Sequence, residues 1–233
     1  MSSAPRAALD AEPVSLGDAV RHVAAGGLVA FPTETVWGLG ADATSAEAVA
    51  RLRAWKTRDA DKPVSVLVEG LAAAEALGVA PTPVARALAR AFWPGPLTLV
   101  MPVGRARLAP GVAAEGAVGL RCSPDPTAAA LARALAHAGC GPLTATSLNR
   151  GGEPPAHSLA EARGLCRAHP GPEVVVPRGP CEPGRVSSAS PSTVVDCTGP
   201  GLQLIREGAI SADALAEAAH REHDAPRGVE AHR

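Results

Sequence analysis

Lysine and aromatic residues are scarce in this chain of 233 residues. Of its 22 Lys and Arg residues only two are Lys, and these are Lys56 and Lys62. With two Phe, three Trp and no Tyr, the core has to be built from Leu, Val and Ala, since hydrophobic residues still make up 46% of the chain. That apolar share excludes disorder throughout. The length suits one large domain or two small ones.

Strong net charge, paired cysteines and long apolar runs are also lacking. The formal net charge is -1, so no global basic field holds nucleic acid, although a local basic groove is compatible with it. No apolar run approaches the roughly 20 residues that span a bilayer, and residues 1–12 lack the apolar stretch of a secretory signal. The odd number of cysteines without Cys-x-x-Cys spacing predicts reduced thiols in a soluble cytoplasmic protein with no membrane contact. The five cysteines are Cys122, Cys140, Cys166, Cys181 and Cys197.

Apolar periodicity, caps and Gly/Pro turns divide the chain into helices and strands. Ser15 is placed to cap the first helix, and Thr44 or Ser45 to cap the second. Helices are predicted at 16–25, 46–55, 71–77, 84–92, 127–137, 158–166 and 211–219, and strands at 28–31, 64–68, 97–101, 118–120, 143–146, 174–176, 193–196 and 202–205. Because several strands follow one another directly, the pattern favours an α/β fold in the loose sense (α+β), with a mixed sheet.

The segment from Phe31 to Asp42 (FPTETVWGLGAD) places hydroxyl groups after a strand, where a small polar ligand can bind. The alternative is an ordinary turn in which Thr33 and Thr35 satisfy backbone donors. A dinucleotide fingerprint at Gly38 is disfavoured, because six residues separate it from the strand end.

Three cations, Lys56, Arg58 and Lys62, follow the second predicted helix. Such a run is usually a solvated loop, but an ammonium and a guanidinium close together also clamp a polyphosphate. Further along, the segment TATSLNRGG (144–152) can present hydroxyls, an amide and backbone N–H groups to an anion, or it is an ordinary turn. Arginines end two predicted strands, at Arg121 and Arg206, and each alone is a weak signal.

Together these segments resemble the YrdC/TsaC family of L-threonylcarbamoyladenylate synthases over about Val14 to Ile210. The seven motifs that carry the resemblance are PTETVWGLGAD, KTRDADKPVSVLV, FWPGPLTLV, VGLR, TATSLN, SPSTVVD and LIREG. It implies a YrdC-like twisted mixed sheet, flanked by helices around a basic concave cavity, in residues 13–211. Composition, by contrast, predicts a disordered lead at 1–12, a mobile loop at the Pro-, Gly- and Ser-rich segment 177–191, and a C-terminal helix within 212–233 with a disordered tail after 219.

The resemblance implies that the protein joins L-threonine, bicarbonate or CO2, and ATP with Mg2+ into threonylcarbamoyl-AMP and pyrophosphate. Downstream tRNA threonylcarbamoyl transferase proteins then use the product to modify adenosine 37 of tRNA (t6A), and a weak tRNA contact is allowed. The threonine amine would attack CO2 or bicarbonate, and the resulting carboxylate the α-phosphorus. Catalysis would then be positioning and charge stabilisation.

The resemblance also implies roles for individual residues. ATP would be bound by Lys56, Arg58, Lys62, Ser147, Asn149 and Arg206, of which Lys56 and Arg58 are catalytic. Threonine would be bound by Thr35, Arg121, Ala145 and Ser192. No protein side chain is assigned to a metal. Leu148 replaces a commoner Ala and is expected to point into the core, and Leu67 stands where some members have His.

Two rival functions stay open at this point. The same domain occurs in carbamoyltransferases that make carbamoyl-adenylate, and it could serve as an RNA-binding module that uses the basic cavity without chemistry. The longer chains and extra domains of the first class argue against it, and the net charge argues against the second. Threonine-dependent release of pyrophosphate would separate them.

Overall fold

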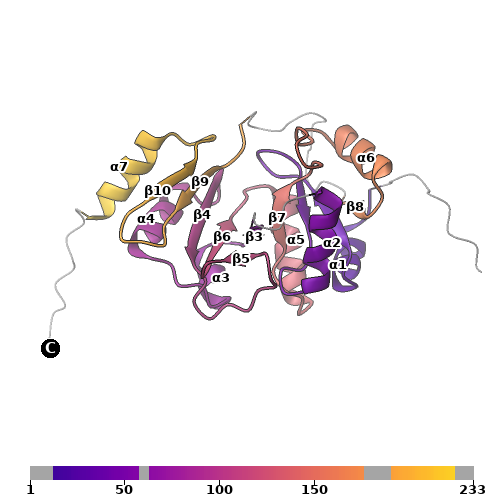
Figure 1. The fold of residues 1–233 in the computed structure, drawn as a ribbon, viewed down its shortest axis with the longest axis horizontal. Coiled ribbons are helices and arrows are strands. Elements are labelled where there is room, and N and C mark those ends of the chain that lie inside the picture. The colour runs from indigo at the N-terminus through magenta and orange to yellow at the C-terminus, as the bar shows by residue number, and fades with distance from the viewer. Residues whose placement is uncertain (1–12, 58–62, 176–189, 224–233) are drawn as a thin grey trace, which may run out of the picture.

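A mixed β-sheet runs through the whole molecule and frames the site (Figure 1). The computed structural model describes residues 13–57, 63–175 and 190–223. The strands in these ranges are β1 (Leu28–Phe31), β2 (Gly38–Gly40), β3 (Ser65–Leu67), β4 (Leu97–Pro102), β5 (Ala113–Ala114), β6 (Ala117–Arg121), β7 (Thr144–Ser147), β8 (Pro172–Val174), β9 (Thr193–Asp196) and β10 (Gln203–Arg206). Within the described ranges their order is β10-β9-β4-β6-β3-β7-β2-β1-β8, with β5 paired to β6.

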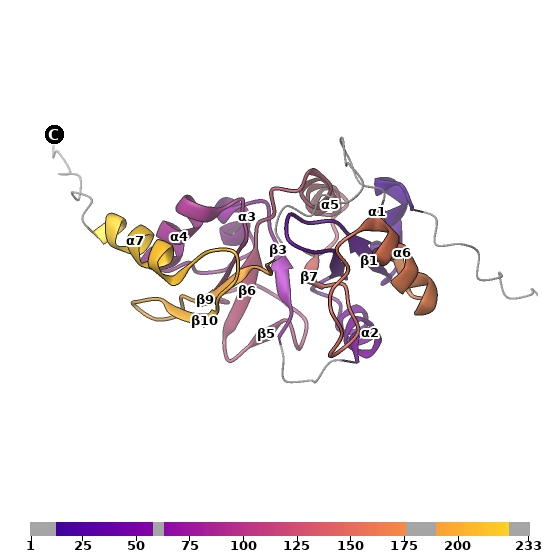
Figure 2. The same ribbon diagram turned by 90° about the horizontal axis from the view of Figure 1, so that it is seen from above.

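The pairing confirms the predicted mixed sheet. Strand β1 pairs in parallel with β8, as do β3 with β6 and β4 with β9, whereas the remaining pairs are antiparallel. The short strand β3 joins two halves of the sheet, because it pairs with β6 on one side and β7 on the other. Figures 1 and 2 show these halves on either side of β3.

Helices cover both halves, and two of them begin at side-chain caps that the sequence predicts. They are α1 (Leu16–Ala24), α2 (Ala46–Lys56), α3 (Leu71–Ala76), α4 (Pro83–Phe92), α5 (Pro126–His137), α6 (Leu159–Ala168) and α7 (Ala212–His223). Ser15 caps α1 as predicted, and of the two candidates for α2 the cap is Ser45, whose Oγ accepts from the Ala48 amide at 3.2 Å. Thr44 instead donates to Asp42. Helix α7 ends at His223, four residues beyond the predicted end of this helix at 219.

The two halves bury their strands differently. In β1, Leu28 and Ala30 pack into one apolar cluster with α2 and α6, while Val29 and Phe31 pack into another with α1 and α5. Both faces of that strand are therefore covered. In β4 and β6, Leu99 and its neighbours pack against α3, α4 and α7 on one face. The opposite face of this half is left to the residues that alternate with them.

Candidate substrate-binding site

That opposite face carries polar side chains from several strands. Thr98 of β4 and Leu67 of β3 are both register partners of Arg121 in β6, so the three side chains lie on one face. Ala145 of β7 pairs with Ser65, two residues before Leu67, and shares this face. The structure thus brings Arg121 and Ala145, both predicted for threonine, to one side of the sheet.

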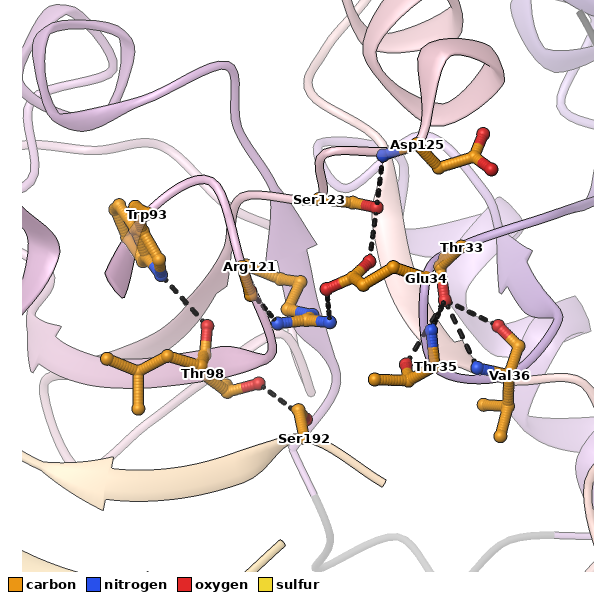
Figure 3. A network of polar contacts seen from close by, with 12 residues as sticks. Thr33, Glu34, Thr35, Val36, Trp93, Thr98, Arg121, Ser123, Asp125 and Ser192 are labelled. Atoms are coloured by element: carbon orange, nitrogen blue, oxygen red, sulfur yellow. Dashed lines mark hydrogen bonds and ion pairs between the residues drawn. The ribbon is translucent and has the colours of Figure 1, made fainter. Parts of the chain in front are cut away.

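Arg121 is buried and ion-paired to Glu34, in the loop after β1 (Figure 3). The exposed fractions of the Arg121 and Glu34 side chains are 7% and 11%. Arg121 Nη2 donates to Glu34 Oε1, Arg121 Nη1 donates to the Gly95 carbonyl, and Ser123 Oγ donates to Glu34 Oε2 at 2.5 Å. Burial lowers the pKa of the Arg121 guanidinium, and the Glu34 carboxylate opposes that shift.

The loop that holds Glu34 is organised by Thr33. Thr33 Oγ1 accepts from the amides of Thr35 and Val36 at 3.2 and 3.3 Å and donates to the Val36 carbonyl at 2.5 Å. The turn interpretation is thereby confirmed for Thr33. Thr35 is 4% exposed and its Oγ1 lies 3.2 Å from that of Thr33, so the loop carries a second hydroxyl next to the first.

A second polar group joins β4, β9 and β10. Thr98 Oγ1 and Ser192 Oγ are 3.0 Å apart, and Ser192 immediately precedes β9. Arg206, the last residue of β10, donates through Nη2 to the Ser192 carbonyl at 2.7 Å and to its Oγ at 3.2 Å. Partial burial lowers the pKa of Arg206. Its guanidinium, predicted to meet phosphates, therefore contacts the residue predicted to meet threonine.

The third group gathers around Lys56 at the end of α2. Its ammonium donates to the carbonyl of Ser147 and to Asn149 Oδ1, the latter at 2.7 Å. Ser147 Oγ also donates to Asn149 Oδ1 at 2.7 Å. The structure thus brings three of the predicted ATP residues together, whereas Arg58 and Lys62 lie outside the described residues.

Several neighbours define what else the site offers. Leu148 is fully buried in the cluster with α2, so its expected inward orientation is confirmed. Burial raises the pKa of the Cys122 thiol to about 11, which makes this cysteine next to Arg121 a poor nucleophile. A cavity of about 200 Å³ opens beside Ser123, Cys122 and Leu67.

Glu34, Ser123 and Thr98 are site residues that sequence reasoning missed. The available signal was the position of Glu34 between the two threonines of the PTET motif. A lone carboxylate in a turn, however, indicates nothing about an arginine 87 residues further along the chain.

The described residues of the site offer hydrogen-bond donors suited to anions. In the ranges that the structure describes, no three His, Cys, Asp or Glu side chains gather as metal ligands. The one carboxylate beside Arg121 is engaged by that arginine and by Ser123. These residues do not fit a Mg2+ ion ligated by protein carboxylates. In the same described ranges, no helix is long and apolar enough to cross a membrane.

A twisted mixed sheet with buried cations and clustered hydroxyls on one face defines an α/β protein that can bind small charged ligands. The chain belongs to the Sua5/YciO/YrdC family, whose model, described as telomere recombination, matches residues 21–208.

Known relatives agree with this assignment. A putative threonylcarbamoyl-AMP synthase of Mycobacterium tuberculosis is 38% identical over 199 residues, covering 85% of this chain and 86% of the relative. The threonylcarbamoyl-AMP synthase of Halorhodospira halophila is 41% identical over 151 residues, or 62% of this chain and 75% of that protein. Because these relatives are named as synthases, they support the conclusion that the chain is an enzyme.

Solved structures share the fold. Sua5 of P. abyssi complexed with L-threonine is 30% identical with a TM-score of 0.76, and the match covers 87% of this chain but only 56% of Sua5. E. coli YciO, at 21% identity and a TM-score of 0.68, is matched over 86% of this chain and 92% of its own length and shows the fold alone.

Proposed function

We propose that the protein is an L-threonylcarbamoyladenylate synthase, a nucleotidyltransferase that forms threonylcarbamoyl-AMP and pyrophosphate from L-threonine, CO2 or bicarbonate, and ATP. The observation that carries the proposal is the shared face on which Arg121 and Ala145 lie, with the hydroxyls of Thr35 and Ser192 contributed by flanking loops. An arginine that is almost fully desolvated is suited to an amino-acid carboxylate, because charge-assisted hydrogen bonds strengthen where water is excluded.

The nucleotide would be bound by the group around Lys56, which joins the end of α2 to Ser147 and Asn149. Lys56 is 3% exposed and its ammonium is surrounded by oxygen acceptors, so phosphate oxygens would exchange with these acceptors. Arg206 would approach the phosphates from β10, and Arg58 and Lys62 would complete the set. Mg2+ would be bound by ATP phosphate oxygens and water molecules, which usually supply most of its ligands in such sites.

The reaction needs positioning more than a covalent nucleophile. The threonine nitrogen attacks the carbon of CO2 and loses a proton, forming N-carboxy-threonine. A carboxylate oxygen of this compound attacks the α-phosphorus of ATP, and pyrophosphate leaves. The cations offset the repulsion between the anions that meet in the second step.

The proposed setting is a cytoplasmic one, in which tRNA threonylcarbamoyl transferase proteins take up the product for tRNA t6A modification. Purified protein supplied with ATP, Mg2+, L-threonine and bicarbonate is expected to release pyrophosphate only when threonine is present. Release with carbamoyl phosphate in place of threonine would favour the carbamoyl-adenylate alternative. No release with either, together with tight binding of structured RNA, would favour an RNA-binding module.

A further inference from the structure

The ion pair of Glu34 and Arg121 links the ends of two strands that are not neighbours in the sheet. Glu34 follows β1 and Arg121 ends β6, and in the described sheet β3, β7 and β2 lie between these two strands. Figure 3 shows the Glu34 carboxylate reaching across to the guanidinium with Ser123 on its other side. The pair is thus a contact between the two halves, at the face that carries the other site residues.

Three segments together fix the position of the guanidinium. The Gly95 carbonyl accepts from Nη1 and the Glu34 carboxylate accepts from Nη2, while Ser123 Oγ donates to the second oxygen of Glu34. A guanidinium has five N–H donors in a rigid fork, so two fixed contacts determine where the remaining donors point. The Glu34 carboxylate, itself anchored, therefore sets the direction of Arg121.

Charge leads to the same conclusion. An arginine as buried as Arg121 is costly without a counter-ion, because desolvation is the largest influence on its pKa and Glu34 is the first that opposes it. Without that carboxylate the guanidinium would be drawn toward water, away from the polar face. Glu34 thus keeps the cation in place before any substrate arrives.

We propose that Glu34 is a positioning residue of the amino-acid site, which with Ser123 holds Arg121 ready for the carboxylate of the substrate amino acid. The inference rests on the proposed function. It differs from that function in assigning a role to a carboxylate that is expected to touch Arg121 and not the reacting atoms.

The experiment compares Glu34→Gln and Ser123→Ala with the wild-type protein in the pyrophosphate assay. Glu34→Gln keeps the size of the side chain and removes its charge, and is expected to raise the threonine KM by about tenfold or more, the effect of weakening one charge-assisted contact. The KM for ATP and kcat are expected to change by less than about threefold. Ser123→Ala keeps the charge and should raise the threonine KM by a smaller factor.

Threonine amide gives a readout that a merely structural role would not move. It lacks the carboxylate, so its inhibition constant against threonine should be nearly the same in wild-type and Glu34→Gln protein. The matched control is Glu75→Gln, which removes a similar carboxylate from the surface pair of Glu75 with Arg86 and should change nothing.

Three outcomes would overturn the inference. An unchanged or lowered threonine KM in Glu34→Gln would mean that Glu34 is neutral or competes with substrate. An equal loss for ATP, threonine and threonine amide, with a lower melting temperature, would mean a structural role only. If Glu34→Gln does not fold, Ser123→Ala with an unchanged threonine KM would reject it. A wild-type protein that releases no pyrophosphate would instead refute the proposed function itself.

Discussion

The ammonium of Lys56 and the amide oxygen of Asn149 are joined by a 2.7 Å hydrogen bond across 93 residues of sequence. The same ammonium donates to the Asn149 carbonyl at 3.2 Å and to the Ser147 carbonyl. Because Lys56 is only 3% exposed, the loop after β7 is held to the end of α2 by a buried cation. One side chain therefore supports the proposed nucleotide site and the packing of the loop.

Replacing Lys56 should affect both stability and activity. Lys56→Met leaves buried oxygens without their donor, and this is expected to lower the free energy of unfolding by about 1–3 kcal/mol. Pyrophosphate release should be abolished. Urea unfolding and the activity assay measure the two effects. Arg167→Met, an exposed cation on α6, is the control and should change neither. Normal activity in Lys56→Met would contradict the nucleotide assignment.

Local patterns predict most of this fold because they are set by neighbouring residues. The caps at Ser15 and Ser45 and the apolar strand β1 are visible in the sequence, and the structure confirms them. The sequence does not predict β2, since Gly38 and Gly40 are typical of turns. This strand exists because β1 and β7 supply hydrogen bonds on both of its sides, which is a tertiary effect.

The same distinction between local patterns and tertiary contacts applies to the candidate site. Motifs predict Lys56 and Arg121 as site residues through a resemblance that covers most of the chain. They do not predict the contact of Glu34 with Arg121, because it depends on which residue faces Glu34 after folding. They also do not predict that Arg206 contacts Ser192 directly, since this contact follows from the antiparallel pairing of β9 with β10.

Cysteine reactivity should separate buried from accessible thiols. Burial raises the pKa of Cys122 to about 11 and of Cys166 and Cys197 to about 12. Near neutral pH these thiols should react with iodoacetamide at least about 100-fold more slowly in the folded protein than in urea, because the thiolate is the nucleophile. The half-buried Cys140 is the internal comparison. Peptide mass spectrometry measures each rate, and equal rates in the folded protein would refute the burial of these side chains.

Asp125, the N-cap of α5, should lower the free energy of unfolding as the pH rises. Burial raises the pKa of Asp125, against hydrogen bonds from the amides of Ala128 and Thr127. The folded protein therefore keeps this proton to higher pH than the unfolded chain, and stability is lost as pH rises above the ordinary value of 3.8. Asp125→Asn keeps a cap without the charge. Its free energy of unfolding relative to wild type should rise as the pH increases through and above this ordinary value.

The control for this pH dependence has the opposite sign. Hydrogen bonding to Ser15 and the charge of Arg21 lower the pKa of Asp18 in α1. Asp18 therefore favours folding above its ordinary pKa, and this contribution is lost as pH falls through the folded value. The free energy of unfolding of Asp18→Asn relative to wild type should fall as pH rises. Parallel slopes for the two variants in chemical denaturation would contradict at least one of the two assignments.

Arg206 should couple the two substrates, since we propose that it contacts the phosphates and it donates hydrogen bonds to the carbonyl and the Oγ of Ser192. Ser192→Ala is expected to raise the threonine KM alone, by about tenfold, the scale of one hydrogen bond to a charged group. Arg206→Gln should raise the KM for threonine and for ATP together, because it removes a phosphate contact and releases Ser192.

The control for this prediction is Arg105→Gln, which replaces an exposed arginine outside this face. Steady-state kinetics with each substrate varied in turn distinguishes the patterns. An ATP effect without a threonine effect in Arg206→Gln would show that the link to Ser192 has no part in substrate binding.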